Sequence, residues 1–148
     1  MEWVPLLKFI HIASAIVAVG ANVTYAYWLR LAGNNPDRLR YTIGAIRGLD
    51  RRVANPAYGV VLLTGLAMVF LGAYPLTAAW VVAALGLYGL VALVGMVLYA
   101  PAIRRQLALA SDPSSDAYRA AAARSGQLAM ATIAIVAVIL ALMVFKPG

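Results

Sequence analysis

The chain has 148 residues, of which 64% are hydrophobic and only 11% are charged, with a formal net charge of +7. A soluble domain usually has about 25% charged residues, so this composition excludes a water-soluble globular protein. The chain contains no cysteine, which excludes disulfides, thiolate metal sites and cysteine nucleophiles. We therefore expect a single integral membrane domain, residues 1–148, with no soluble domain large enough to hold a separate active site.

Three long stretches of the chain contain almost no Asp, Glu, Lys, Arg or His. Residues 53–103 contain no Asp, Glu, Lys, Arg or His, residues 125–145 contain none either, and residues 9–29 contain only His11. A transmembrane helix needs about 20 predominantly apolar residues. The central stretch is therefore long enough for two helices, and each flanking stretch is long enough for one. The sequence predicts an all-α fold, a four-helix transmembrane bundle with antiparallel up-down order.

The first predicted span covers about residues 4–29 and has tryptophan or tyrosine at both ends, as is typical of membrane interfaces. Asn35 and Pro36 then supply an N-cap and a first-turn proline for a helix over residues 37–53. Apolar residues recur in this segment at helical spacing, and arginines fill the other face. We therefore expect a short amphipathic cytoplasmic helix between spans one and two.

The other three spans are predicted at about residues 55–71, 77–100 and 125–145. Asn55 with Pro56 is a second pair of cap and proline, and it marks the start of span two. Asp112 with Pro113 repeats this pair before the last helix. Residues 72–75 form a tight turn, so spans two and three are expected to be neighbours.

The cations are concentrated in two loops. Six of the twelve Lys and Arg residues lie between spans one and two, and four lie between spans three and four. The positive-inside rule therefore predicts that both basic loops are cytoplasmic and that both termini lie outside. These arginines are expected to contact anionic lipid headgroups of the bilayer, which accounts for the charge without nucleic acid as a partner.

His11 is the one Asp, Glu, Lys, Arg or His residue within the three stretches 9–29, 53–103 and 125–145. Ser14, Ala18, Asn22 and Tyr25 share its face of the helix, because each residue turns the helix by about 100°. A polar stripe that faced hydrocarbon would be costly. The stripe is therefore predicted to face the bundle interior or a partner, and it is a candidate binding site.

Three interpretations of His11 remain open. It is a neutral imidazole hydrogen-bonded to a neighbouring helix, an axial ligand of haem b, or part of a proton or ion relay. Only as a haem ligand would His11 bind a metal. The second axial ligand would then be His11 of another copy in a homodimer, a methionine, or none. The methionines available for this role are Met68, Met96, Met130 and Met143.

A second polar cluster is predicted beside the cytoplasmic ends of spans two and three. Asp50, Arg51 and Arg52 precede span two, and Arg104 and Arg105 follow span three. The four arginines are candidates for binding an anion such as a haem propionate or a lipid phosphate, and headgroup contact with topology control is the alternative. No paired carboxylates, histidine cluster, phosphate loop or Ser-His-Asp combination is present, so no catalytic residue is predicted.

Several segments resemble a bacterial family of predicted integral membrane proteins of unknown function. They are Leu7–Ile12 with Gly20, Leu49–Pro56, and Tyr99–Pro101 followed by Arg104, Arg105 and Gln106. The histidine in the first span is also similar to a looser group that contains the CopD membrane domain of copper resistance and the HemJ-type protoporphyrinogen oxidase. In that group an early-helix histidine is implicated in haem binding. The resemblance implies that His11 is the ligand position and that the protein lies in the bacterial inner (plasma) membrane.

These observations leave three classes of function. The first is a non-enzymatic subunit or component that forms a homo-oligomer or joins a larger membrane complex, and the small residues along the spans favour such helix packing. The second is a b-type haem-binding membrane protein with His11 as axial ligand. The third is a small oligomeric transporter or channel. The lack of a catalytic set favours a role without enzymatic activity.

Overall fold

The computed structural model describes residues 2–147, and within this range it contains helices and turns but no strand. The helices are α1 (Trp3–Ala32), α2 (Pro36–Leu49), the π-helix η1 (Asp50–Ala54), α3 (Asn55–Phe70), α4 (Ala79–Leu93), the π-helix η2 (Val94–Tyr99), α5 (Ala100–Leu109) and α6 (Asp116–Phe145). Because α2, η1 and α3 are continuous, and α4, η2 and α5 are too, the chain forms four long helices. Each is long and apolar enough to cross a membrane, so the predicted all-α, four-helix membrane fold is confirmed.

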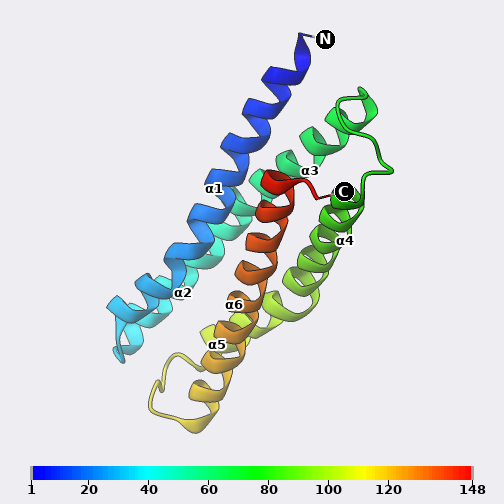
Figure 1. The fold of residues 1–148 in the computed structure, drawn as a ribbon. Coiled ribbons are helices and arrows are strands. Elements are labelled where there is room, and N and C mark those ends of the chain that lie inside the picture. Colours follow the sequence, from blue (N-terminus) through cyan, green and yellow to red (C-terminus); the bar gives the residue numbers. More distant parts are fainter. Residues whose placement is uncertain (1, 148) are drawn as a thin grey trace.

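The helices are arranged in two layers, one built from α1, α2 and α3 and the other from α4, α5 and α6 (Figure 1). Helix α1 packs along α3, and α4 packs along α6. By contrast, no Cα atom of α3 comes within 8 Å of α4, although the two helices follow one another in the chain. The layers meet where α1 approaches α6 and where α2 approaches α5. The fold therefore leaves space between the layers.

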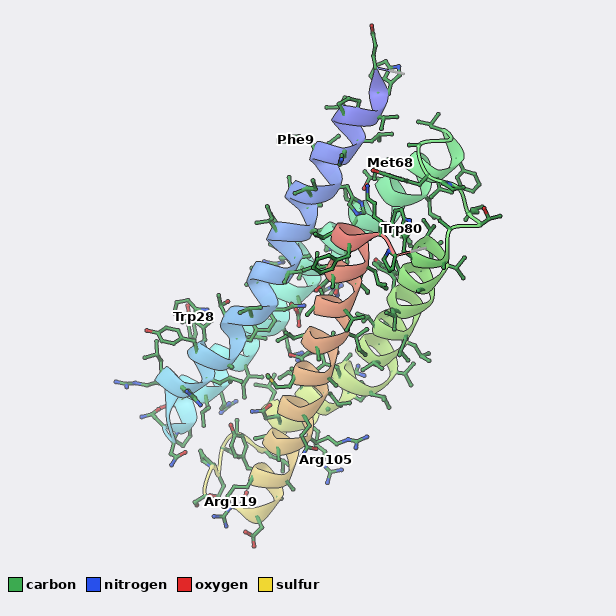
Figure 2. All side chains as sticks on the ribbon, viewed as in Figure 1. Phe9, Trp28, Met68, Trp80, Arg105 and Arg119 are labelled. Carbon is green, nitrogen blue, oxygen red and sulfur yellow. The ribbon has the colours of Figure 1, made fainter. Side chains whose placement is uncertain are left out.

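The turn after α1 and the turn after α5 lie at the same end of the molecule, and the N-terminus lies at the opposite end (Figure 1). We call the end with these two turns the basic end, because arginines surround it. Figure 2 shows Arg105 and Arg119 there, whereas Phe9 and Met68 lie towards the other end, which we call the far end. Many large apolar side chains between the two ends are exposed, including Phe9, Leu63 and Met96, as expected for helices surrounded by hydrocarbon.

Helix α2 begins at a capped proline, as the sequence predicts. The side chain of Asn35 accepts a hydrogen bond from the backbone N–H of Arg38 at 3.0 Å, and Pro36 is the first helical residue. Leu39, Ile43 and Ile46 of α2 are buried. Leu39 and Ile43 belong to the main hydrophobic cluster of the basic end, which consists of Ala32, Leu39, Ile43, Ile103, Ala110 and Tyr118. This cluster holds the two layers together.

The expected helix break at Pro56 is replaced by a π-helical segment. Asn55 does not cap a new helix, because η1 carries the chain from α2 into α3 without interruption. Similarly, η2 carries the chain from α4 into α5 just before Pro101. A proline inside a helix removes one N–H donor and crowds the carbonyl four residues earlier. The wider turn of a π-helix is a local way to accommodate such a residue, and such segments are frequent at functional sites.

The last helix also starts later than its cap-and-proline pair predicts. Helix α6 begins at Asp116, and Ser115 is its N-cap, accepting a hydrogen bond from the backbone N–H of Tyr118 at 3.1 Å. Asp112 and Pro113 lie in the preceding turn instead. The helix then runs to Phe145, which is where the sequence places its end.

Candidate functional site

A cavity of about 2310 Å³ lies between the two helix layers, and all four long helices contribute to its wall. Ligand pockets in proteins commonly have volumes of about 300–1,000 Å³, so this space is large enough for a macrocycle or a lipid chain. It exists because α3 and α4 stay apart. Polar side chains reach the wall at three levels, which we describe from the far end to the basic end.

At the first level, the imidazole of His11 on α1 contacts Thr64 on α3. His11 is 8% exposed, and its Nδ1 lies 2.9 Å from the Thr64 hydroxyl oxygen. The same hydroxyl donates to the backbone oxygen of Val60 at 2.7 Å. A hydroxyl has one proton to donate, so Thr64 must accept the hydrogen bond from His11. This hydrogen-bond pattern assigns the proton to Nδ1 and the lone pair to Nε2.

Gly65 allows this close approach of His11 to α3. A Cβ atom at position 65 would lie 3.2 Å from Cε1 of the imidazole. No other glycine in residues 2–147 would place a Cβ within 4 Å of a neighbouring group. The imidazole therefore packs against bare backbone, and its position depends on the absence of a side chain at Gly65.

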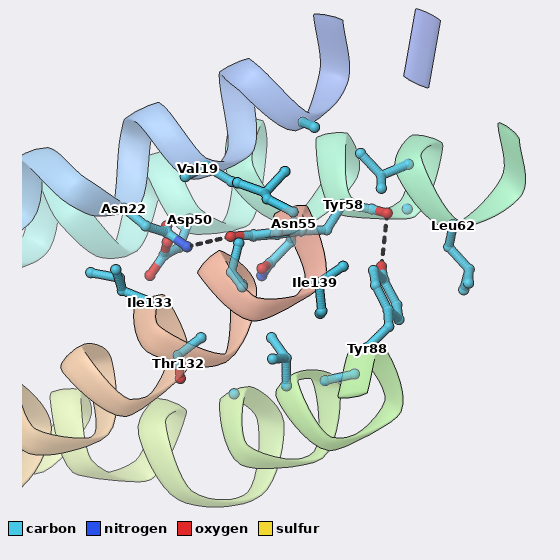
Figure 3. A pocket seen from close by; sticks show the side chains of 18 of the residues that line it. Val19, Asn22, Asp50, Asn55, Tyr58, Leu62, Tyr88, Thr132, Ile133 and Ile139 are labelled. Atoms are coloured by element: carbon cyan, nitrogen blue, oxygen red, sulfur yellow. Dashed lines mark hydrogen bonds between the residues drawn. The ribbon is translucent and has the colours of Figure 1, made fainter. Parts of the chain in front are cut away.

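At the second level, Asn22 on α1 donates from Nδ2 to the hydroxyl of Tyr58 on α3 at 2.9 Å. Tyr88 on α4 crosses the cavity and donates to the backbone oxygen of Tyr58 at 2.8 Å (Figure 3). Asn22 Oδ1 is buried, and it is the one buried side-chain oxygen or nitrogen without a hydrogen-bond partner in the part of the chain that the structure describes. This level thus contains an unpaired acceptor that neighbouring atoms cover.

At the third level, the Tyr25 hydroxyl donates to Oδ1 of Asp50 at 2.6 Å. Asp50 is the first residue of the π-helix η1 and is half-buried. It forms no ion pair, because the one salt bridge within residues 2–147 joins Arg119 and Asp116 on the surface of α6. Four arginines line this end of the cavity: Arg47, which is half-buried, and Arg51, Arg52 and Arg104, which are exposed.

Comparison with protein families gives one match. The family described as "Predicted integral membrane protein (DUF2269)" matches residues 5–147. The chain belongs to this family. The predicted membership of a family of integral membrane proteins of unknown function is thus confirmed, whereas the likeness to CopD and HemJ-type proteins stays a prediction. No curated protein and no solved structure matches the chain.

In this DUF2269 protein, most of the predicted site residues lie on the cavity wall. His11, Asn22 and Tyr25 line it from α1, and each one bonds to the second long helix. Ser14, by contrast, is half-buried, does not line the cavity and forms no side-chain hydrogen bond among the described residues. Arg105 also lies off the cavity wall.

Both lysines and three of the four candidate methionines lie on the cavity wall. Met68 is buried and lines the cavity with Met96 and Met143, whereas Met130 does not. Two lysines, Lys8 and Lys146, line the far end. The Lys146 ammonium lies 4.7 Å from the ring centre of Tyr74 and 5.7 Å from that of Trp80. No group of three or more His, Cys, Asp or Glu residues that could hold a metal ion occurs in the described chain.

Sequence reasoning missed the partners on α3 and α4. Thr64, Tyr58 and Tyr88 lie within the stretch of residues 53–103 that has no Asp, Glu, Lys, Arg or His, so a search for those five residue types passes over them. What distinguishes these residues in the sequence is a hydroxyl group within an otherwise apolar span. Such a polar group is costly in hydrocarbon. A search for every hydroxyl and amide within the spans would have found them.

Proposed function

We propose that this integral membrane protein binds a b-type haem between its two helix layers, with His11 as axial ligand. The observation that carries the proposal is the state of His11. The imidazole is buried at the cavity wall and its Nδ1 lies 2.9 Å from the Thr64 hydroxyl oxygen. With the proton assigned to Nδ1, the Nε2 lone pair has no side-chain hydrogen bond among the described residues. A metal-binding histidine almost always donates its other ring N–H to a fixed acceptor, as His11 does here.

The other cavity residues fit such a group. The wall is mostly apolar and the volume exceeds what a macrocycle needs. Met68 is buried one helical turn from Thr64, so it is the methionine best protected from the surroundings. Lys8 and Lys146 at the far end provide positive charge for the propionates. When bound, the haem would supply a redox-active iron whose potential depends on its ligands and on burial.

We also propose that the role is non-enzymatic and is exercised in an oligomer. The chain has a single histidine, so a second imidazole ligand would have to come from another copy. Blue-native electrophoresis of the detergent-solubilised protein should then show a defined homo-oligomer or a larger complex. Migration as a lone monomer in the presence and absence of haemin would contradict this part of the proposal.

The haem proposal is tested by absorption spectroscopy. The protein is purified in mild detergent and titrated with haemin, and a Soret band is expected in the parent protein. His11→Ala should abolish the band or shift its position, whereas Met130→Leu, which alters a residue away from the cavity, should leave it unchanged. Absence of a Soret band, or an identical band in His11→Ala, would leave His11 as a structural imidazole bonded to α3.

A second candidate function is transport of a small anion. Cationic side chains line both ends of the same cavity, with Lys8 at the far end and Arg52 and Arg104 at the basic end, and Asp50 is the one acidic residue on its wall. Such an arrangement would favour anions over cations within it. Chloride flux into liposomes should then depend on the protein and fall when Arg52 and Arg104 are both changed to Gln. If chloride flux is unchanged both in this variant and in a variant with His11 and Asn22 replaced together, the pathway does not run through this cavity.

A further inference from the structure

The second and third long helices stay apart along most of their length. No Cα atom of η1 or α3 comes within 8 Å of α4, η2 or α5. Helix α2 packs against α5 and closes this opening at the basic end. We call the opening between η1–α3 and α4–η2–α5 the slot. Within the described chain, one hydrogen bond crosses it, from the Tyr88 hydroxyl to the backbone oxygen of Tyr58 (Figure 3).

The cavity reaches the outer surface of the protein through the slot. Val53 on η1 and Met96 on η2 both line the cavity, and they are 38% and 71% exposed. Each of these side chains therefore belongs to the inner wall and to the outer surface. Because both are apolar, a hydrocarbon chain that passes between them covers no polar side chain of either residue. An acyl chain of the surrounding bilayer can enter the cavity by this route.

Arginines flank the slot at its basic end. Arg51 and Arg52 on η1 line one edge of the cavity, and Arg104 on α5 lines the other. Arg47 lines the same end from α2. None of the four forms a salt bridge in the part of the chain that the structure describes. Asp50, the one carboxylate on the cavity wall, accepts a hydrogen bond from α1 instead. The positive charge at this end is therefore left for an external anion.

We propose that the slot binds an anionic phospholipid, with the phosphate held by Arg52 and Arg104 and an acyl chain inside the cavity. Guanidinium groups bind phosphate oxygens through charge-assisted hydrogen bonds. The mostly apolar wall favours hydrocarbon over water, and the volume of about 2310 Å³ gives it room. A soluble anion would use the arginines alone, whereas a lipid uses both features. The inference does not depend on haem, whose propionates are proposed to lie at the far end.

Two arginines outside the cavity allow this site to be distinguished from ordinary headgroup contact. Arg38 on α2 and Arg105 on α5 are exposed and lie off the cavity wall. General attraction between a basic surface and an anionic bilayer grows with the number of cations near the surface. Binding in the slot depends instead on which arginines are present, because only those on its edges reach the phosphate.

The first test titrates the purified protein in mild detergent with dioleoylphosphatidylglycerol or dioleoylphosphatidylcholine and measures bound lipid by native mass spectrometry. The two lipids share their acyl chains and phosphate, but the choline ammonium balances the phosphate charge. We expect the anionic lipid to bind about tenfold more tightly. Soluble glycerophosphate at an equal concentration should not displace it. Equal binding of the two lipids, or displacement by glycerophosphate, would overturn the proposal.

The second test compares two double variants that remove the same charge. Arg52→Gln with Arg104→Gln should weaken binding of dioleoylphosphatidylglycerol by about tenfold, since both phosphate contacts are lost. Arg38→Gln with Arg105→Gln should leave this affinity unchanged. Equal losses in the two proteins would show ordinary headgroup attraction and refute the site. His11→Ala should keep the preference for the anionic lipid while losing the Soret band, which separates this inference from haem binding.

The third test narrows the slot without changing its charge. Gly95 on η2 lines the cavity, and nothing lies within 4 Å of a Cβ added there. Gly95→Leu should therefore fill part of the slot and weaken binding of dioleoylphosphatidylglycerol. Gly126→Leu is the control, because Gly126 is exposed on α6, lies off the cavity wall and also has space for a Cβ. Full affinity in Gly95→Leu would place the acyl chain outside the cavity and refute the assignment.

Discussion

His11 and Thr64 are 53 residues apart in the chain, yet Nδ1 of one lies 2.9 Å from Oγ1 of the other. This contact joins α1 to α3 and, with Nδ1 assigned as the donor, leaves Nε2 as the free ring nitrogen. Asn22 with Tyr58 and Tyr25 with Asp50 repeat the connection further along the same pair of helices. Three polar contacts thus hold the first layer together along one wall of the cavity.

The first prediction concerns the acceptor of the His11 proton. Thr64→Val removes this acceptor and leaves Nδ1–H buried without a partner. We expect haem affinity to fall by about 10- to 100-fold, as on loss of other groups that orient metal-binding histidines. Haemin titration measures the change. Thr132→Val is the matched control, because Thr132 lines the cavity but bonds only to the backbone of its own helix. Equal affinities in the two variants would show that Thr64 does not orient the imidazole.

The second prediction concerns the backbone beneath the imidazole. Gly65→Ala places a Cβ 3.2 Å from His11 Cε1, which forces the ring or α3 to move, and we expect a lower melting temperature by tryptophan fluorescence. Gly59→Ala is the control on the same helix, since nothing lies within 4 Å of its added Cβ. Alanine is favoured over glycine in a helix by about 1 kcal/mol, so Gly59→Ala should be neutral or stabilising. If the Gly65→Ala protein is as stable as the Gly59→Ala protein, the added Cβ does not displace the imidazole of His11.

The membrane-spanning helices could be predicted from the sequence because the exclusion of charged side chains from hydrocarbon applies to each residue separately. Hydrocarbon excludes charge from about 20 consecutive positions, so a charge-free run indicates a span without knowledge of its neighbours. Helical periodicity likewise puts His11, Asn22 and Tyr25 on one face of α1, and all three side chains do contact the second long helix. Whether they bind a ligand stays a prediction.

The side-chain pairs between helices and the cavity depend on how the helices pack against one another. A local sequence pattern does not specify this packing. The pairing of His11 with Thr64 requires the axial register of α1 against α3. The cavity requires α3 and α4 to stay apart, whereas a short turn between helices suggests close neighbours. The continuous helix through Pro56 was missed because proline usually marks a helix start, and here a π-helical turn accommodates it instead.

The third prediction concerns Tyr25 and Asp50. Their 2.6 Å hydrogen bond joins α1 to the π-helix η1 and involves a carboxylate. Hydrogen bonds to charged groups contribute about 1.5–3 kcal/mol, so Tyr25→Phe should lower the free energy of unfolding in mild detergent by about this amount. Asp50→Asn keeps an acceptor and should have a smaller effect. A double variant whose loss equals the sum of the two single losses would show that the two side chains do not interact.

The last prediction concerns orientation in the membrane, which we propose from the positive-inside rule. The chain contains no cysteine, so a single introduced cysteine can be labelled without background. Ser114→Cys lies in the turn between α5 and α6 at the basic end, and Thr77→Cys lies in the turn between α3 and α4. In intact cells a membrane-impermeant maleimide should label Thr77→Cys, whereas Ser114→Cys should react only after the membrane is opened. The reverse pattern would invert the proposed topology and place the arginines at the basic end outside the cell, where the headgroup argument for them no longer holds.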